Sequence, residues 1–210
     1  YYDSYAAMLQ MAGAVRRPVT LRAPDFRLDL AALEAAVTDR TRMILLNSPH
    51  NPTGTVLTRV ELEAVATLAR RHDLVVVTDE VYEHLVYDDH EHVPISTLPG
   101  MAERTLTLSS VGKSWSLTGW KVGWATGPAP LVGAVLAAKQ WLTFTSGAPL
   151  QPAVELALDA HDGWPGELAL DLASRRDLLV EGLEAVGLGC RPAEGTYFEV
   201  TDVAALGWDD

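Results

Sequence analysis

Short, largely apolar runs recur along the chain and are bounded by turn-forming residues. They cover residues 43–47, 74–78, 105–109 and 122–126. Each run is the length of a strand, and nearly continuous apolar character is typical of strands that are buried on both faces. The pattern therefore predicts four strands of a buried parallel sheet.

Segments with a helical period separate these runs. One helix is expected over residues 30–37 and another over 59–71, where apolar residues recur at intervals of three and four. Thr58 and Glu61 match a capping box at the start of the second helix. Strands that alternate with helices of this length indicate right-handed βαβ units.

The pattern becomes mainly helical after Gly127 and Pro128. Helices are expected over residues 131–142, 152–158 and 166–186, and a strand-like run follows at 196–200. The turn-rich residues 161–165 mark the best candidate boundary. We therefore expect one domain over residues 1–162 and the beginning of a second over 163–210.

Composition excludes several classes of protein. The chain of 210 residues is 48% hydrophobic, enough for a sizeable core, and its formal charge of −12 leaves no basic stripe for nucleic acid. No stretch approaches the roughly 18 consecutive apolar residues of a membrane helix. Cys190 cannot form an internal disulfide, which fits a reducing cytoplasm. We expect a cytoplasmic protein with no nucleic-acid or membrane partner, and we interpret the chain, which begins with Tyr1, as an internal fragment.

Lys113 is the first candidate for chemistry. The chain has three lysines against thirteen arginines, and Lys113 follows the expected strand 105–109 within the run Ser109-Ser110-Val111-Gly112-Lys113. A deprotonated amine condenses with an aldehyde to a Schiff base, which a guanidinium cannot do. Ser110 and Lys121 could then hold a phosphate, so the run suggests a covalent anchor for an aldehyde cofactor.

Two further polar segments follow strand ends, where an open α/β sheet places its ligands. The turn at residues 47–54 contains Asn51 and two X-Pro bonds, either of which can be cis. Asp79 leaves an apolar strand and needs a cationic partner, for which a protonated pyridine nitrogen would serve. Tyr82 could share a helical face with Asp79.

Together these segments resemble the fold type I, class I/II family of pyridoxal-phosphate aminotransferases. The resemblance rests on Asn51-Pro52-Thr53-Gly54, Asp79-Glu80-Val81-Tyr82 and Ser110-Val111-Gly112-Lys113 with Gly119-Trp120-Lys121-Val122-Gly123. It implies an α/β fold, a three-layer sandwich with a mostly parallel central sheet, joined to the start of a small α+β C-terminal domain. It also implies pyridoxal 5'-phosphate as cofactor and a homodimer.

The resemblance assigns roles by position. Lys113 would form the Schiff base and move the proton, and Asp79 would pair with the ring nitrogen. Asn51 and Tyr82 would bind the ring hydroxyl oxygen, with Asn51 also contacting substrate. Three more residues would bind the cofactor: Ser110 and Lys121 its phosphate, and Tyr2 its ring by stacking. At the position of Lys121 many members have arginine. The catalytic residues are thus expected to be Lys113, Tyr82 and Asp79.

The substrate rests on resemblance alone. Residues 78–87 and 137–142 are most similar to members that act on N-succinyl-LL-diaminopimelate and 2-oxoglutarate in lysine biosynthesis. Kynurenine and methionine aminotransferases and cysteine-S-conjugate β-lyases share the same motifs. From other classes, an aminotransferase-like sensor domain of a transcription regulator and a degenerate domain without cofactor are alternatives.

His84, His90 and His92 are a weaker signal. They could suggest a metal, but the acidic run around residues 88–92 has no cysteine ligand and is interpreted as a solvated loop. We expect no metal.

Overall fold

A four-stranded sheet forms the centre of the chain. In the computed structural model, which describes residues 1–145, 147–160 and 163–207, the strand order is β1-β2-β3-β4. The strands are β1 (Met43–Asn47), β2 (Val75–Asp79), β3 (Thr105–Ser110) and β4 (Gly123–Thr126). β1 has the bounds that the sequence predicts, and each of the other three strands begins and ends within one residue of its predicted bounds.

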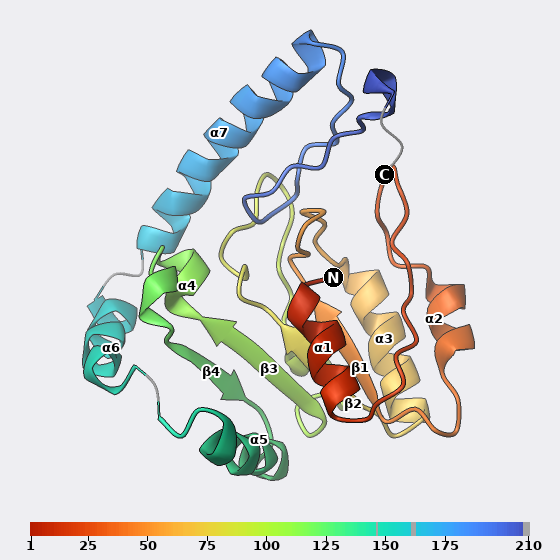
Figure 1. Cartoon of the computed structure of the whole chain (residues 1–210), viewed down its shortest axis with the longest axis vertical. Coiled ribbons are helices and arrows are strands. Elements are labelled where there is room, and N and C mark those ends of the chain that lie inside the picture. Colours follow the sequence, from red (N-terminus) through yellow and green to blue (C-terminus); the bar gives the residue numbers. More distant parts are fainter. Residues whose placement is uncertain (146, 161–162, 208–210) are drawn as a thin grey trace.

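Helices precede, connect and follow the strands (Figure 1). The α-helices of the described residues are α1 (Asp3–Met11), α2 (Leu30–Ala36), α3 (Arg59–Arg71), α4 (Val111–Ser114), α5 (Ala129–Leu142), α6 (Gln151–Ala160) and α7 (Trp164–Ala185). Short 3₁₀ turns are η1 (Ile95–Thr97), η2 (Thr118–Trp120), η3 (Ala148–Leu150) and η4 (Ala204–Leu206). None of the helices in the described part of the chain is long and apolar enough to span a membrane.

The first three strands run parallel. Asn47 of β1 pairs with Asp79 of β2, and Asp79 in turn pairs with Leu108 of β3. Their carboxyl ends therefore meet at one edge of the sheet, as expected for ligand sites in open α/β folds. The predicted α/β class with a mostly parallel sheet is confirmed.

The core lies between β1, β2 and the helices α2 and α3. Leu62, Val65 and Ala69 of α3 are buried against Val76 of β2 and Ile44 of β1. The capping box fixes where α3 begins: the Thr58 hydroxyl accepts from the Glu61 N–H, and the Glu61 carboxylate accepts from the Thr58 N–H at 2.7 Å. Both the helix and its cap agree with the prediction.

The fourth strand departs from the all-parallel pattern. β4 is antiparallel to β3, with Ser110 paired to Gly123 and Thr107 to Thr126. The connection between the two strands holds only the short helix α4 and the turn η2, so the chain doubles back without a full crossover helix. Parallel pairing would need a connection that carries the chain back along the full length of the sheet, usually an α-helix, and this connection contains no such helix.

Residues 196–200 do not form the expected strand. Among the described residues they make no ladder, and only isolated bridges flank them, from Gly195 to Val86 and from Thr201 to Cys190. Thr196 adopts a φ of +70°, which interrupts any strand there. The segment is instead a loop that runs back to the sheet edge.

The structure adds one helix to the prediction and leaves the domain boundary untested. The helix α1 was not expected, and the domain boundary between residues 162 and 163 touches residues 161 and 162, which lie outside the described residues. The division into two domains remains a prediction. The helix α7 follows that point and is joined to the rest of the fold through Arg176, whose guanidinium binds Asp88 at 2.8 Å and the Ala193 carbonyl at 2.8 Å.

The core assignment predicts how two positions on α3 respond to truncation. Leu62→Ala removes a side chain that is 3% exposed, whereas Val60→Ala truncates one that is 70% exposed. We expect Leu62→Ala to lower the free energy of unfolding by about 2–4 kcal/mol because it leaves a cavity. Val60→Ala should change it by less than about 0.5 kcal/mol. Denaturant unfolding measures both, and equal losses would contradict the assignment.

Candidate active site

The carboxyl end of β2 is held in place by the turn that follows β1. The Asp79 carbonyl accepts from the Asn47 side-chain amide at 2.9 Å and from the Ser48 N–H at 3.2 Å. The Asn47 amide oxygen in turn accepts from the Asn51 N–H at 2.8 Å. Asn47 was not among the predicted site residues. Its position could have indicated the role, because a polar amide at the last residue of a buried strand lies at the edge where ligands bind.

The Asp79 carboxylate is hydrogen-bonded to the phenol of Tyr5. The Tyr5 hydroxyl donates a short hydrogen bond to Asp79 Oδ2, and the Val81 N–H lies 3.3 Å from Oδ1. Burial raises the pKa of the Tyr5 hydroxyl well above its usual range, and the hydrogen bond to Asp79 adds to the shift. Tyr5 is therefore a neutral donor that satisfies a partly buried carboxylate.

Tyr2 lies beside this pair. Its ring meets the Tyr5 ring edge to face with centroids 5.8 Å apart, and the residue is 54% exposed. Sequence reasoning selected Tyr2 from the Tyr1-Tyr2-Asp3-Ser4-Tyr5 run and missed Tyr5. The helical spacing that turns Tyr5 toward Asp79 belongs to α1, which was not predicted.

The turn after β1 brings Asn51 to the same edge. Both the Ser48-Pro49 and the Asn51-Pro52 peptide bonds are cis, in agreement with the expectation of a cis bond here. His50 Nδ1 lies 2.7 Å from the Thr53 hydroxyl, and burial lowers the pKa of His50 to about 4. Asn51 is half-buried, and no hydrogen bond of its side chain to another described residue is formed.

Tyr82 is nearly fully buried, with 2% of its surface exposed. It lies in a turn and not on the helical face expected from its spacing to Asp79. Its hydroxyl is 3.4 Å from the Tyr197 hydroxyl, and the two rings meet edge to face at 5.4 Å. Burial raises the pKa of Tyr82 far above its usual range, with a further contribution from Tyr197, so the phenol stays neutral.

Lys113 lies on α4, directly after β3. Its Nζ donates to the Tyr197 hydroxyl at 2.7 Å and lies 5.8 Å from the centre of the Tyr82 ring. Ser110 is the N-cap of α4, with its hydroxyl accepting from the Gly112 N–H at 3.2 Å. The structure thus places Lys113, Tyr82 and Ser110 on neighbouring strand ends.

Lys121 lies two residues before the start of β4, which pairs with β3. Gly123 pairs with Ser110, and the Val111 N–H donates to the Val122 carbonyl at 3.3 Å. Lys121 adopts a left-handed conformation with a φ of 55° and is exposed. The residues that follow Lys121 pair with Ser110 and Val111, and the Lys121 side chain is exposed to solvent.

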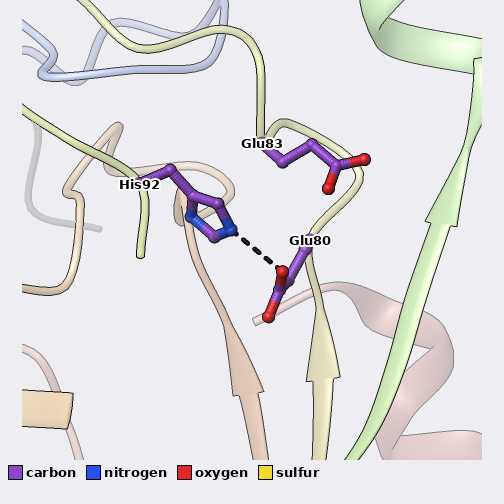
Figure 2. Close-up of side chains that lie close together, drawn as sticks. All are labelled: Glu80, Glu83 and His92. Atoms are coloured by element: carbon purple, nitrogen blue, oxygen red, sulfur yellow. Dashed lines mark hydrogen bonds and ion pairs between the residues drawn. The ribbon is translucent and has the colours of Figure 1, made fainter. Parts of the chain in front are cut away.

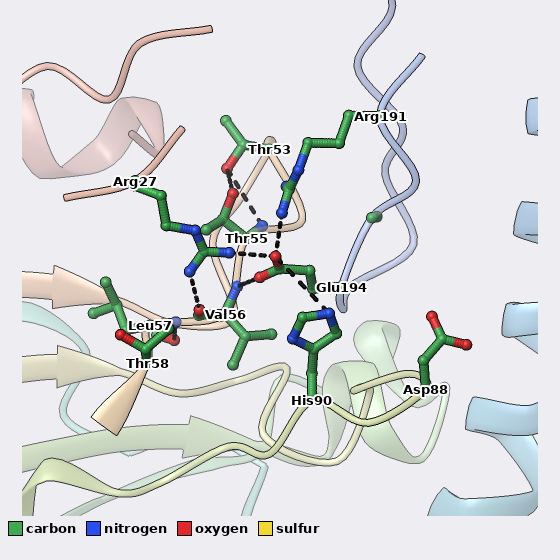
Figure 3. A network of polar contacts seen from close by, with 12 residues as sticks. Arg27, Thr53, Thr55, Val56, Leu57, Thr58, Asp88, His90, Arg191 and Glu194 are labelled. Carbon is green, nitrogen blue, oxygen red and sulfur yellow. Dashed lines mark hydrogen bonds and ion pairs between the residues drawn. The ribbon is translucent and has the colours of Figure 1, made fainter. Parts of the chain in front are cut away.

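A network of charges joins the N-terminal segment to the loop that carries Tyr197 (Figure 3). The buried Glu194 carboxylate accepts short hydrogen bonds from Arg27 and Arg191, and it also accepts from the Val56 N–H at 2.8 Å. Arg27 also donates to the Val56 carbonyl at 2.9 Å. We refer to Arg27, Arg191 and Glu194 as the Glu194 clasp.

A second cluster of polar side chains, formed by Glu80, Glu83 and His92, lies just past the end of β2 (Figure 2). Ligand atoms of Glu80, Glu83 and His92 lie within 4.8 Å of one another. His92 Nε2 is 2.9 Å from the Glu80 carboxylate, and Glu83 accepts from the Ser109 hydroxyl at 2.6 Å. These side chains have protein partners, so we interpret the cluster as a brace between the ends of β2 and β3.

Residues 88–91 are exposed, in agreement with the interpretation of this run as a solvated loop, and His92 is the exception. The His92 side chain is only 8% exposed, because it pairs with the buried Glu80. Asp88 binds Arg176 at 2.8 Å. The loop is therefore solvent-exposed over most of its length, with His92 bound to Glu80 at the end of β2 and Asp88 bound to α7.

The side chains at this edge fit a pyridoxal phosphate. They supply a primary amine at Lys113, a carboxylate at Asp79, phenols at Tyr82 and Tyr2, and a hydroxyl and a cation at Ser110 and Lys121. A carboxylate suits a protonated ring nitrogen, and the hydroxyl, N–H groups and cation suit a phosphate. No chemistry in this donor set opposes that cofactor.

Comparison with known proteins identifies the family. The family model for aminotransferase class I and II matches residues 1–208, and the chain belongs to that family. This family is generally dependent on pyridoxal phosphate.

Two sequence relatives show the range within the family. A probable N-succinyldiaminopimelate aminotransferase of Mycobacterium tuberculosis is 53% identical over 213 residues, which cover 100% of this chain and 53% of that protein. Kynurenine–oxoglutarate transaminase 3 of Mus musculus is 41% identical, with 100% of this chain and 50% of that protein covered. The chain spans about half the length of these curated relatives.

Solved structures confirm the fold. The structure of N-succinyldiaminopimelate aminotransferase from Mycobacterium tuberculosis matches with a TM-score of 0.96 and 51% identity, covering 100% of this chain and 55% of that one. YbdL from Escherichia coli, described as having a methionine aminotransferase function, matches with a TM-score of 0.93 and 35% identity over 98% of this chain and 54% of that one.

The Glu194 clasp predicts a pH-dependent contribution to stability. Burial opposes ionisation of Glu194, but the Val56 N–H and the Arg27 guanidinium outweigh that cost and hold the pKa of Glu194 below its usual range. A lowered pKa stabilises the folded state above the ordinary glutamate value of about 4.3, and that contribution is lost as the pH falls through the folded-state pKa. Glu194→Gln should therefore cost about 2 kcal/mol at neutral pH, because it removes the charge that strengthens the hydrogen bonds from Arg27, Arg191 and the Val56 N–H.

Denaturant unfolding between about pH 7 and pH 3 checks this expectation across the range in which glutamate titrates. The gap between the unsubstituted protein and Glu194→Gln should narrow at the acidic end. Glu63→Gln is the matched control, since Glu63 is 56% exposed and pairs with Arg59 on the surface of α3. A gap that stays constant with pH would contradict the role of the Glu194 charge.

Proposed function

We propose that the complete protein containing this chain is a pyridoxal-phosphate-dependent aminotransferase that moves an amino group between an amino acid and a 2-oxo acid. Family membership and the placement of Lys113, Asp79 and Tyr82 at one sheet edge support the proposal. The observation that carries it is that the Lys113 amine contacts the phenols of Tyr197 and Tyr82, at the end of the strand next to the one that ends in Asp79. Ser110 is the N-cap of the helix that holds Lys113.

When bound, pyridoxal phosphate supplies an aldehyde and a ring that accepts electrons from the substrate carbon. Lys113 would anchor the cofactor through its amine, and as a free amine it would take and return the proton at the substrate's α-carbon. Asp79 holds a proton on the ring nitrogen. In this role Asp79 would exchange its hydrogen bond with Tyr5 for an ion pair with the protonated ring nitrogen.

The remaining side chains orient the cofactor. Tyr82 and Asn51 donate to the ring hydroxyl oxygen, and the raised pKa of Tyr82 keeps its proton available for that bond. Ser110 and Lys121 bind the phosphate, and Tyr2 stacks on the ring. Lys121 acts as a point charge and not as a planar fork, so it imposes less direction on the phosphate than arginine does.

For the substrate, we propose N-succinyl-LL-diaminopimelate with 2-oxoglutarate as the acceptor. The 53% identity to the Mycobacterium tuberculosis relative supports this choice over the 41% identity to the mouse kynurenine transaminase. The second candidate is a kynurenine- or methionine-type aminotransferase, which is favoured by the match to the Escherichia coli protein. A homodimer and a cytoplasmic location are further parts of the proposal.

Covalent labelling tests the cofactor chemistry. The complete protein is incubated with pyridoxal phosphate and reduced with borohydride, and the modified peptide is mapped by mass. We expect the label on Lys113, because its amine faces the site, and no label at that peptide in Lys113→Ala. Lys139→Ala is the matched control and should keep the label. A folded protein without label at Lys113 would remove the enzyme proposal and favour a degenerate or regulatory domain.

A comparison of amino donors tests the proposed substrate. The rate of amino transfer to 2-oxoglutarate is compared for N-succinyl-LL-diaminopimelate, kynurenine and methionine at equal concentration. We expect the first donor to have a kcat/KM at least about tenfold higher, equivalent to about 1.4 kcal/mol of transition-state binding. Turnover of kynurenine without turnover of the succinylated donor would reverse the order of the candidates.

A further inference from the structure

We propose that Tyr197 is a positioning residue for Lys113, an inference that rests on the proposed aminotransferase function. Its hydroxyl accepts the hydrogen bond of the Lys113 amine whenever that amine is not bonded to the cofactor. The Nζ–hydroxyl distance is 2.7 Å, which is in the range of a strong hydrogen bond.

Tyr197 fits this role because of its neighbours. Its ring packs edge to face on Tyr82 and lies 4.7 Å from the Phe198 ring, so the hydroxyl is held in one direction. Lys113 Nζ lies 5.3 Å from the Tyr197 ring centre and 5.8 Å from that of Tyr82. The amine is thus held between two phenols, one of which is proposed to bind the cofactor.

The backbone of the loop delivers Tyr197 to this place. The N–H groups of Glu194 and Gly195 both donate to the Gly54 carbonyl, at 3.0 and 2.9 Å, and the Thr196 N–H donates to the Leu85 carbonyl at 2.9 Å. A Cβ at position 195 would lie 2.6 Å from the Leu85 carbonyl oxygen, so only glycine allows this approach. The loop is therefore fixed both to the turn that carries Asn51 and to the segment after Tyr82.

Thr196 shows that the loop position is imposed. This β-branched residue is fully buried and has a φ of +70°, a conformation that costs free energy for such a side chain. Such strain persists only where surrounding contacts determine the backbone, and it is enriched at functional sites. Here the strained residue directly precedes Tyr197.

The Glu194 clasp holds the other side of the loop. Glu194 binds Arg27 and Arg191 three residues before Tyr197, so the loop is tied to the N-terminal segment as well as to the sheet edge. Once substrate has displaced Lys113 from the cofactor, an unrestrained lysine side chain could turn away into solvent. The Tyr197 hydroxyl keeps the amine at the edge where its next proton transfer takes place.

Tyr197→Phe tests the inference, because it removes only the hydroxyl of a residue that is 46% exposed. In the cofactor-free complete protein, reductive methylation with formaldehyde and a borane is followed by mass at Lys113, with Lys121 and Lys139 as internal references. We expect methylation of Lys113 to become about tenfold faster, because the amine loses a charge-assisted hydrogen bond. In the cofactor-loaded protein, kcat should fall about tenfold while KM changes less than about twofold.

Tyr87→Phe is the matched control. The Tyr87 hydroxyl donates to the Thr196 carbonyl in the same loop and makes no hydrogen bond to Lys113. The backbone hydrogen bonds to Gly54 and Leu85 remain in this variant, so both the methylation rate of Lys113 and kcat should stay within about twofold. If Tyr87→Phe changed both quantities as much as Tyr197→Phe does, a general loosening of the loop would replace the proposed contact.

The outcomes separate this inference from the function on which it rests. A Tyr197→Phe protein that takes the pyridoxal phosphate label at Lys113 but keeps an unchanged kcat or an unchanged methylation rate would overturn the positioning role alone. Failure of the label at Lys113 in the unsubstituted protein would overturn the proposed function. Faster methylation together with a lower kcat at constant KM would support both.

Discussion

The parallel alignment of β1, β2 and β3 is the constraint on which the candidate site depends. The pairing of Asn47 with Asp79, and of Asp79 with Leu108, sets the three carboxyl ends level with one another. Adjacent strands lie about 4.8 Å apart, so side chains just beyond these ends come within reach of one cofactor-sized ligand. A slip of one residue would turn every side chain of a strand to the other face, which would separate Asp79 from Tyr5 and Lys113 from Tyr82.

Hydrogen bonds and ion pairs between buried polar side chains maintain this alignment. The Asn47 side chain binds the Asp79 carbonyl, and Glu83 binds the Ser109 hydroxyl, so each strand end is joined to the next. Buried carboxylates at Glu80 and Glu194 would be unfavourable without partners, and each has a nitrogen donor or a histidine beside it. The same contacts that satisfy these charges also fix the segment after β2 and the loop that carries Tyr197.

The sequence predicted the strands, the helix α3 with its capping box, and the family. Each of these rests on local signals: apolar runs, a helical period, and motifs of few residues. Two predictions were wrong: that β4 is parallel to its neighbour, and that residues 196–200 form a strand. Both features depend on contacts between residues far apart in the chain. The φ of Thr196 is set by hydrogen bonds to Leu85 and Gly54 around it, which no local pattern reveals. Tyr5 and Tyr197 were missed for the same reason, since their partners Asp79 and Lys113 are 74 and 84 residues away.

A crystal structure of the complete protein with pyridoxal phosphate would test the central claim, that the carboxyl ends of β1, β2 and β3 build one cofactor site. We predict continuous density from Lys113 Nζ to the cofactor, and a distance of about 2.6–3.2 Å between the Asp79 carboxylate and the ring nitrogen, as for a hydrogen bond. The phosphate should lie against Ser110. A cofactor bound elsewhere, or an Asp79 carboxylate still engaged by Tyr5 with no contact to the ring, would contradict the account.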